Sequence, residues 1–453
     1  MGSSPTPTYR SSHRGGLARE LLDDPMSAMT EIAAMRAPIV KGRAGLLPVC
    51  FVVDPALARQ VLQTDQKTFR RNPLVNHLFK AASGENLFTA SGSAWKWRRA
   101  LVGQPFRQEA LRRDLPEMIE AVNAEVVSWP ADTAVDPQVL CMDTALNVAA
   151  KMMFSTTLDP ATARGLRQAM DGVVDWITHR MEHPAAAPLL VPTAANRQFR
   201  QSRKQAREII GGLVGQRRRE PTASSDLLDD LIAAVDPSTG QTLTDGQLVD
   251  ELVVLLFAGH ETTASAAAWT IELLARHPDI QDRARQEVAD ATQGEPIAPQ
   301  HIPKLHYVAA SIEETLRLYP PAWGIPRMAY RTARIGEASI RPFTPTIVAL
   351  AAMHRSPDHW DNPDDFKPER FLTEEDTTAH QPFGLGPRRC IGARFATQEL
   401  IITIATLLHQ RQITPSATQP ATPHAVFALR AKDSRVHLSC TASEPAILSS
   451  TQD

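Results

Sequence analysis

The sequence of 453 residues predicts a mainly α-helical protein with small β-sheets, and three observations lead to that prediction. Apolar residues recur at helical spacing from about residue 16 to residue 410, with Pro-rich turns between the segments. The β-type runs are few and short, and one very long helix can be delimited at both ends. No linker divides the chain, so we expect a single domain at residues 16–445, with a disordered head at residues 1–15 and a frayed tail at residues 446–453.

The long helix is predicted over Asp245–Arg276. Thr244 and Gln247 form a capping-box pattern before it, and His277-Pro278 closes its far end. At a rise of 1.5 Å per residue the helix would be about 48 Å long, which is the diameter of a whole domain. We therefore expect it to pass through the core.

The β-type segments are short. The apolar run from Val49 to Val53 is stopped by Asp54-Pro55 and predicts a strand, and further strands are expected near residues 335–340, 346–350 and 435–438. Residues 412–423 contain three prolines and predict an irregular loop that leads to a C-terminal hairpin.

Composition excludes several classes of protein. Hydrophobic residues make up 43% of the chain, which is enough for a large core, and the net charge of −2 argues against a nucleic-acid partner. No run of 18 apolar residues occurs and the N-terminal segment is polar, so neither a membrane anchor nor a signal peptide is expected, and a cytoplasmic location is. Cys50, Cys141, Cys390 and Cys440 form no C-x-x-C pair, which argues against a disulfide scaffold or a structural zinc site.

Polar residues interrupt the apolar middle of the long helix. Ala258-Gly259 is followed by His260, Glu261 and Thr262, where propensity disfavours Gly and Thr. One interpretation is a solvent-facing kink. The other is that Gly259 lets a flat ligand approach the backbone while Glu261 and Thr262 supply a proton path in a dry site. A zinc protease motif is excluded, because position 264 of the H-E-x-x-H pattern is Ala.

A Gly-rich loop places Cys390 directly before an amphipathic helix. A thiol at a helix N-terminus, close to Arg388 and Arg389, has its ionised form stabilised, so we expect a thiolate. Such a thiolate acts as a nucleophile, a redox centre or a metal ligand. Phe383 and the loop glycines suit the close packing of a flat ring.

The loop matches the haem-binding signature F-x-x-G-x-R-x-C-x-G at every fixed position, and the chain resembles the cytochrome P450 family. Four further motifs of that family occur in the family's order: W-x-x-x-R at Trp95–Arg99, A-G-x-[DE]-T-[TS] at 258–263, E-x-x-R at 314–317 and P-E-R-F at 368–371. The resemblance implies the cytochrome P450 fold, with haem b between the long helix and the Cys-loop helix.

The resemblance also implies a haem site. Cys390 would be the proximal iron ligand, packed with Phe383, Gly384 and Gly392. The haem carboxylates would be held by Trp95, Arg99, Arg327 and Arg388, while Arg98 is either a neighbour of theirs or a surface charge. Glu314, Arg317 and Arg370 would form a buried ion-pair cluster that supports the Cys loop.

By the same resemblance, the protein would be a monooxygenase that uses O2. Ala258 and Gly259 would lie against the distal face of the haem, and Thr262 and Glu261 would supply protons for oxygen activation. Two alternatives stay open: a haem-thiolate enzyme for oxidative coupling or desaturation, and a non-catalytic haem or ligand-binding protein. Electrons would come from NAD(P)H through a reductase and a ferredoxin or flavodoxin.

The resemblance places the substrate pocket in mostly apolar segments. These predict a lipophilic small molecule, such as a terpenoid or a polyketide-type metabolite. The candidate pocket residues are Leu74, Val75, Leu78, Phe79, Phe88, Trp176, Leu255, Ile325 and Phe427. For any single one of them an ordinary core position is the favoured interpretation, and only the set as a whole predicts the pocket.

The remaining expectations concern partners and one departure from the family. Six cations have two possible roles: they gather on one face to dock an acidic electron donor, or they are scattered surface charges. They are Lys96, Arg107, Arg112, Arg113, Arg389 and Arg394. A monomer is expected. Where many relatives have Gly in a tight turn, residues 340–345 place Thr344, which adopts positive φ less readily and leaves the turn in doubt.

Overall fold

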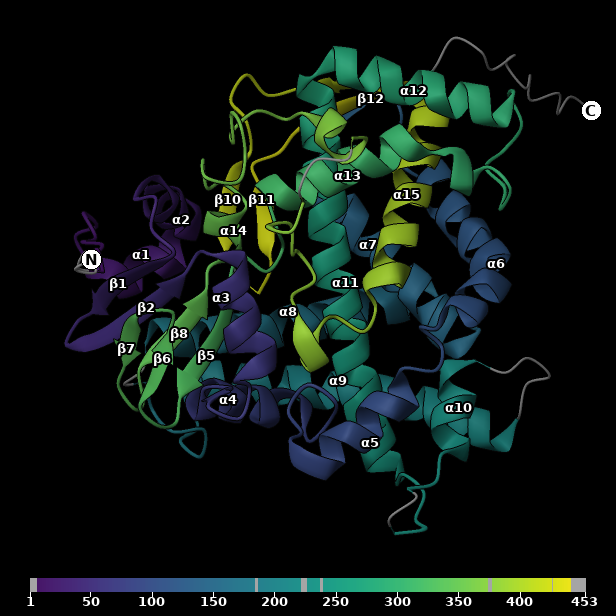
Figure 1. Cartoon of the computed structure of the whole chain (residues 1–453). Coiled ribbons are helices and arrows are strands. Elements are labelled where there is room, and N and C mark those ends of the chain that lie inside the picture. The colour runs from purple at the N-terminus through teal and green to yellow at the C-terminus, as the bar shows by residue number, and fades with distance from the viewer. Residues whose placement is uncertain are drawn as a thin grey trace, which may run out of the picture.

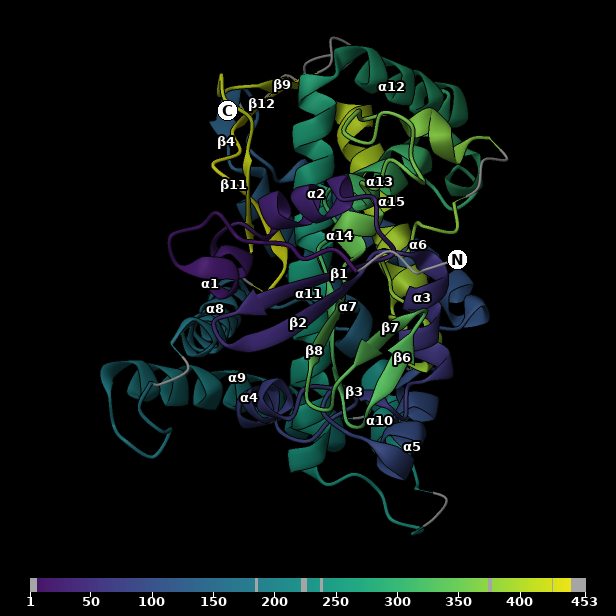
Figure 2. The same ribbon diagram turned by 60° about the vertical axis from the view of Figure 1, so that its left-hand side comes forward.

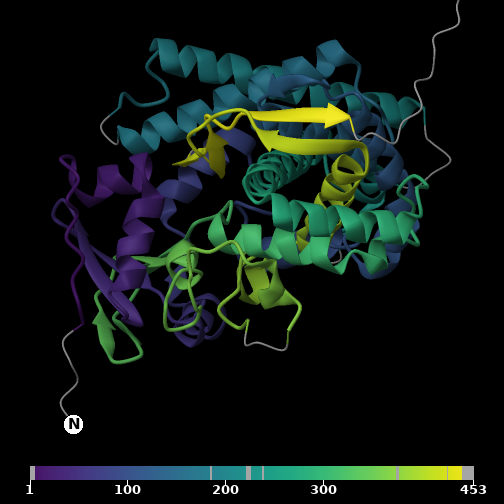
Figure 3. The same ribbon diagram turned by 90° about the horizontal axis from the view of Figure 1, so that it is seen from above.

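The long helix organises the fold. The computed structural model describes residues 6–183, 186–220, 226–236, 239–373, 377–425 and 427–440. Helix α11 has the predicted bounds, Asp245–Arg276, and both hydrogen bonds of the predicted capping box at Thr244 and Gln247 are present. Figure 1 shows α11 running the height of the molecule, and Figure 3 looks along it, with other elements on all sides. The prediction of a helix that crosses the core is confirmed.

Helices make up most of the described residues, which confirms the mainly α prediction. The α-helices are α1 (Gly16–Asp23), α2 (Pro25–Ala34), α3 (Pro55–Arg59), α4 (Pro73–Ser83), α5 (Gly92–Val102), α6 (Gln108–Val127), α7 (Pro137–Phe154), α8 (Pro160–Glu182), α9 (Ala194–Arg219), α10 (Leu227–Ala233), α11, α12 (Pro278–Thr292), α13 (His306–Leu318), α14 (Leu350–Met353) and α15 (Ala393–Gln410). The shorter helical turns are η1 (Gln60–Thr64), η2 (Ile302–Lys304), η3 (Pro368–Phe371) and η4 (Gly386–Arg388).

The strands form small sheets at the edges of the helical body. The largest has the order β1 (Ile39–Ala44), β2 (Leu47–Val52), β8 (Pro345–Val348), β5 (Ile325–Ala329) and β3 (Phe69–Arg70), and its β2–β8 pair is parallel. The others are β4 (Thr133–Val135), β12 (Val436–Cys440) and β9 (Arg411–Pro415), the hairpin β10 (Thr422–Ala425) with β11 (Leu429–Lys432), and the hairpin β6 (Ala333–Ile335) with β7 (Ala338–Ile340). Figure 2 shows the largest sheet beside α11, with α1 and α2 near it.

Two sequence predictions about the strands need correction. Residues 411–415 are not an irregular loop: they form β9, which pairs antiparallel with β12 from Arg411 opposite Cys440 to Pro415 opposite Val436. A partner more than 20 residues away gives no local signal, and Pro415 is tolerated because it ends the strand. The turn at residues 340–345 places Phe343, not Thr344, at positive φ (61°), and Thr344 is buried instead.

The expected disordered head is shorter than residues 1–15. Thr8 forms a bridge with Lys41 of β1, and Tyr9 is buried and donates its hydroxyl hydrogen to Glu20 at 2.8 Å. An aromatic side chain buried with its hydroxyl satisfied fixes the chain before α1. Residues 1–5 and the expected tail at 446–453 lie outside the described residues.

The C-terminal hairpin is fastened to the middle of α11. The indole N–H of Trp269 and the hydroxyl of Ser265 both donate to the carbonyl of Leu429, at 2.8 and 2.5 Å. The Trp269 ring stacks on Tyr319 at 3.8 Å between centroids. These contacts place Phe427 and Arg430 beside the central helix.

None of the described helices is both long and apolar enough to span a membrane.

One buried carboxyl on α15 leads to a pH prediction. Glu399 is 3% exposed, and burial raises its pKa to about 8. Between its ordinary pKa of 4.5 and about 8, the folded protein keeps a proton that the unfolded chain releases, so stability falls as pH rises through this window. We expect Glu399→Gln to raise the free energy of unfolding at pH 8 by about 4 kcal/mol and to leave it nearly unchanged at pH 4.5.

Urea unfolding of the wild type and Glu399→Gln at several pH values measures this effect. Glu120→Gln, at an exposed position of α6, is the matched control and should follow the wild type at every pH. An equal gain for Glu399→Gln at pH 4.5 and pH 8 would show that the buried charge is not its cause.

Candidate active site

The Cys loop has a backbone that only glycine accommodates at two positions. Gly384 and Gly386 have φ of 70° and 72°, and a Cβ on Gly386 would lie 2.5 Å from the carbonyl oxygen of Leu62. The loop closes on itself through the amide of Cys390, which donates to the carbonyl of Phe383 at 3.0 Å. Close packing against η1 and this hydrogen bond hold the cysteine just before α15.

Cys390 is exposed to solvent, but the surrounding protein still desolvates its thiol. Burial raises the pKa of its thiol, while the N–H of Gly392 and the charges of Arg99 and Arg389 oppose that rise. The helix terminus and the arginines therefore do not by themselves lower this pKa, and the thiolate stays a prediction. A bound metal ion removes this proton, because only the thiolate is a ligand.

The middle of α11 forms a second wall of the candidate site, opposite the Cys loop in the sequence prediction, and one face of the helix is open there. Ala258 is exposed although Phe257 before it and His260 after it are buried, and a Cβ built on Gly259 meets no atom within 4 Å. Thr262 follows one turn later and donates its hydroxyl hydrogen to the carbonyl of Ala258 at 2.7 Å. The helix is continuous here and Glu261 is buried, so a solvent-facing kink is excluded.

Four arginines gather near the Cys loop, and none of them is paired with a carboxylate of the described residues: Arg71, Arg99, Arg327 and Arg388. Burial lowers the pKa of Arg71 to about 9, with Arg388 and Arg327 as further causes, and that of Arg327 to about 10, with Arg388 as the further cause. One terminal nitrogen each of Arg71 and Arg388 is buried without a hydrogen-bond partner among the described residues. Buried guanidinium groups without hydrogen-bond partners are stabilised by binding carboxylates or phosphates.

Haem b fits this arrangement. Its two carboxylates would satisfy the orphaned guanidinium groups, and its flat ring would lie between the open face of α11 and the thiol of Cys390. The observation that decides the fit is the pair of buried, unpartnered nitrogens on Arg71 and Arg388. Arg71 was not predicted from the sequence, because it belongs to no motif and stands in an irregular stretch before α4.

The predicted neighbours of this cluster divide into two groups. The guanidinium of Arg388 lies over the ring of Trp95 at 4.6 Å and donates to the carbonyl of Ala90 at 2.8 Å, so Trp95 lies at the cluster. Arg98 is neither a haem neighbour nor a surface charge: it is buried and forms an ion pair with Glu251 of α11. Arg98 and Arg99 are adjacent on α5, but Arg98 is paired with Glu251 and Arg99 belongs to the cluster near the Cys loop.

Glu261 is held in an ion pair that the sequence analysis missed. Its two carboxylate oxygens accept from Arg430 of β11 at 2.8 and 2.9 Å, and Arg430 also lies 3.6 Å from Asp171 of α8. The side chain of Asp171 is 40% exposed, so charged groups connect buried Glu261 with solvent. The sequence signal for this ion pair was Arg430 itself, a charged residue in a strand whose buried positions alternate with less buried ones.

The structure brings Glu314, Arg317 and Arg370 together as a buried cluster. Glu314 accepts from Arg317 at 2.6 and 2.8 Å and from Arg370 at 3.2 Å, and it also accepts the amide of Lys367 at 2.9 Å. Arg317 donates to the carbonyls of His354, Pro363 and Asp365. The hydrogen bonds to His354, Pro363, Asp365, Lys367 and Arg370 join α13 to the segment that leads to the Cys loop.

The predicted pocket residues are only partly brought together. Phe79, Phe88 and Phe427 line one apolar cavity of about 50 Å³ with Phe257 and Ala258 of α11. Trp176 belongs to the core instead, where it stacks on Phe199 at 4.0 Å and donates to Asn196. The others do not line this cavity: Leu74 is 62% exposed, Val75 and Leu78 are half-buried on α4, Leu255 packs in the core, and Ile325 lies on β5 near Gly384.

The predicted cations near the Cys loop also divide into two groups. Arg112, Arg389 and Arg394 line a surface groove of about 960 Å³, together with Arg59, which the sequence analysis missed. Lys96, Arg107 and Arg113 do not line it, and Arg113 is paired with Asp114 at 2.6 Å. Phe383 and Gly384 also line the groove, which places it on the outer side of the Cys loop.

Comparison with known proteins agrees with this geometry. The cytochrome P450 family model matches residues 15–437. A cyclooctat-9-en-7-ol 5-monooxygenase of Streptomyces melanosporofaciens is 29% identical over 83% of each chain, and a pentalenene oxygenase of Streptomyces avermitilis is 28% identical over 88% of this chain and 89% of its own. The haem domain of cytochrome P450DA has the same fold, with a TM-score of 0.84 and 22% identity over 96% of this chain and 97% of its own.

These matches cover nearly the whole described chain, including the Cys loop, α11 and the buried ion-pair cluster. The family implies haem, O2 and a supply of electrons, and its relatives above are named as oxygenases. The chain belongs to the cytochrome P450 family, and it is an enzyme, a monooxygenase of that family.

Proposed function

We propose that this monooxygenase inserts one oxygen atom of O2 into a lipophilic, terpenoid-type small molecule by hydroxylation or epoxidation. The observation that carries this proposal is the cavity beside Ala258, whose lining is almost entirely apolar and includes Phe79, Phe88, Phe257 and Phe427. Such a cavity orients a hydrocarbon by shape and excludes water. The relatives named as cyclooctat-9-en-7-ol 5-monooxygenase and pentalenene oxygenase act on substrates of this kind.

The residues of the site have distinct roles in this proposal. Bound haem supplies the activation of O2. Cys390 holds the iron, and Arg71, Arg99, Arg327 and Arg388 hold the carboxylates. Ala258 and Gly259 leave the face of α11 open for O2 and the substrate.

Protons reach this face through the hydroxyl of Thr262, which lies one turn from Gly259. Glu261 supplies protons from solvent by way of Asp171, when the ion pair between Glu261 and Arg430 opens.

The proposed substrate class can be tested with the purified holoprotein and a surrogate ferredoxin system. We expect sesquiterpene and diterpene hydrocarbons and alcohols to change the haem absorption spectrum on binding, and to be converted to products heavier by one oxygen atom. Conversion to coupled or dehydrogenated products instead would contradict oxygen insertion. Substrate-independent O2 uptake across the panel would contradict catalysis on this class.

We further propose that a separate ferredoxin- or flavodoxin-type protein delivers the electrons and docks at the groove outside the Cys loop. Arg59, Arg112, Arg389 and Arg394 give that groove a positive lining, which suits an acidic partner. A monomer in the cytoplasm stays a prediction.

Neutralising one groove cation should slow electron transfer. We expect Arg112→Gln to lower the rate of reduction by an acidic ferredoxin about 3- to 10-fold at low salt and to flatten its dependence on ionic strength, because steering depends on unpaired surface charge. Arg113→Gln is the matched control, since Asp114 already neutralises Arg113. Stopped-flow reduction measures both. Equal rates for Arg112→Gln and the wild type at low salt would contradict docking at this groove.

A further inference from the structure

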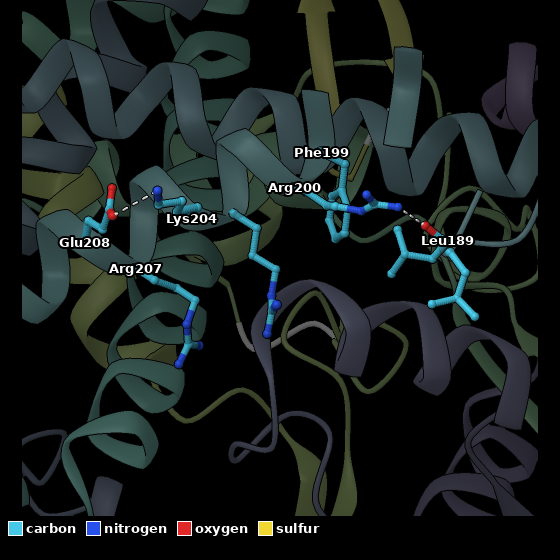
Figure 4. A pocket seen from close by; sticks show the side chains of 8 residues that line it. Leu189, Phe199, Arg200, Lys204, Arg207 and Glu208 are labelled. Carbon is cyan, nitrogen blue, oxygen red and sulfur yellow. Dashed lines mark hydrogen bonds and ion pairs between the residues drawn. The ribbon is translucent and has the colours of Figure 1, made fainter. Parts of the chain in front are cut away.

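Two arginines of α9 separate the apolar cavity from a groove on the outside of the molecule. Arg203 and Arg207 line the inner cavity with Ala82 and Ser83 of α4, and they also line an outer groove of about 640 Å³. The groove is further lined by Leu189, Leu190, Phe199, Arg200, Lys204 and Glu208. Figure 4 shows Arg207 reaching away from α9, with Leu189 further along the same groove. The wall between the two spaces is therefore formed by cations.

Most cations of this wall are already neutralised or bonded. Arg207 forms an ion pair with Asp250 of α11, and Asp250 also accepts the amide of Glu85 at 3.2 Å. Lys204 lies 3.6 Å from Glu208, as the dashed line in Figure 4 marks. Arg200 donates to the carbonyl of Leu189 at 2.5 Å on the outer side of the groove.

Of the two arginines that line the inner cavity, Arg207 is paired with Asp250 and Arg203 is not. Its Nε donates to the carbonyl of Ala82 at 3.2 Å, and no carboxylate of the described residues lies within ion-pairing distance of it. The side chain is half-buried. Burial lowers its pKa and the charge of Arg207 adds to that effect, while Asp250 opposes it. An anion at this position would therefore gain a partly desolvated guanidinium partner.

The inner cavity gives the rest of the ligand's chemistry. Apart from Ser83 and the two arginines, its lining residues are hydrophobic, and it reaches Ala258 on the open face of α11. The cavity of about 50 Å³ must widen to hold a terpenoid, and a separation of α4 from α9, both of which line it, would widen it. The hydrogen bond from Arg203 to Ala82 is one of the contacts that such a separation would break.

We propose that Arg203 binds the carboxylate of a lipophilic acid whose hydrocarbon part occupies the apolar cavity and reaches Ala258. This inference rests on the proposed function and names its substrate more closely: an acid oxidised at the end remote from its carboxylate. One guanidinium without a carboxylate partner matches one carboxylate in a bidentate pair. The carboxylate would replace the carbonyl of Ala82 as the partner of Arg203.

Equilibrium dialysis of the holoprotein at pH 8 tests this proposal without relying on turnover. The probes are abietic acid and palmitic acid, each paired with its methyl ester, so that a diterpenoid and a fatty acid are compared. We expect at least one acid to bind about tenfold or more tightly than its ester. Arg203→Gln should weaken that acid about tenfold and change ester binding less than twofold, and Arg203→Lys should retain part of the preference.

Lys204→Gln is the matched control, because Lys204 lines the outer groove and not the inner cavity. It should leave the preference for the acid intact. Thermal unfolding of each variant shows whether the fold is kept. Equal affinity for acid and ester in the wild type, or an equal loss of both in Arg203→Gln, would overturn the role of Arg203. In that case neutral terpenes would still be bound and oxidised, so failure of this proposal can be distinguished from failure of the proposed function.

Discussion

Glu314→Ala is expected to lower the free energy of unfolding by about 3–5 kcal/mol, because it leaves two buried arginines without their carboxylate. Glu314 and Arg317 are fully buried and Arg370 is 4% exposed, so water cannot replace the lost partner. The same carboxylate also accepts the amide of Lys367, and the segment it fastens precedes the Cys loop. We therefore expect haem content per protein to fall together with stability.

Urea unfolding and the ratio of haem to protein absorbance measure the two effects. Glu313→Gln is the matched control, because Glu313 neighbours Glu314 on α13 but lines the surface groove instead of the buried cluster. It should cost less than about 1 kcal/mol. A Glu314→Ala protein with the urea midpoint and haem content of the wild type would show that the cluster does not support the Cys loop.

Thr262→Ala is expected to lower the rate of product formation about 100-fold, within the range that proton transfer by a positioned side chain contributes. The hydroxyl of Thr262 lies on the open face of α11, one turn from Gly259, and alanine offers neither a donor nor an acceptor there. Substrate binding should change little, since the loss affects a proton path and not the apolar cavity.

Three measurements distinguish this role from a structural one. Thr262→Ser should recover most of the rate, because it restores the hydroxyl. Thr263→Ala is the matched control, since Thr263 is buried, and its rate should stay within about twofold. The spectrum of substrate binding should be the same in all variants. Full product formation by Thr262→Ala would exclude the proposed proton path.

The elements that the sequence predicted best are those with strong local signals. Helix α11 has a capping box at one end and His-Pro at the other, and the Cys loop needs glycine at Gly384 and Gly386 for its backbone. These signals depend only on neighbouring residues, so they can be recognised without the fold.

The features that the sequence analysis missed depend on partners far along the chain. Strand β9 exists because β12 pairs with it, and Glu261 is held by Arg430, which lies 169 residues away. Arg71 belongs to no motif, and only the fold shows that it joins the other arginines near the Cys loop. Trp176 looked like a pocket residue because an apolar side chain in a core and one in a cavity follow the same helical spacing.

The absorption spectrum of the reduced, carbon monoxide-treated holoprotein tests the central claim most directly, namely that the sulfur of Cys390 binds the iron. We predict a strongly red-shifted Soret band for the wild type and for Cys440→Ser, the control at another exposed cysteine, and loss of that band in Cys390→Ser. A haem-loaded wild type without this band, or a Cys390→Ser protein that keeps it, would contradict the account.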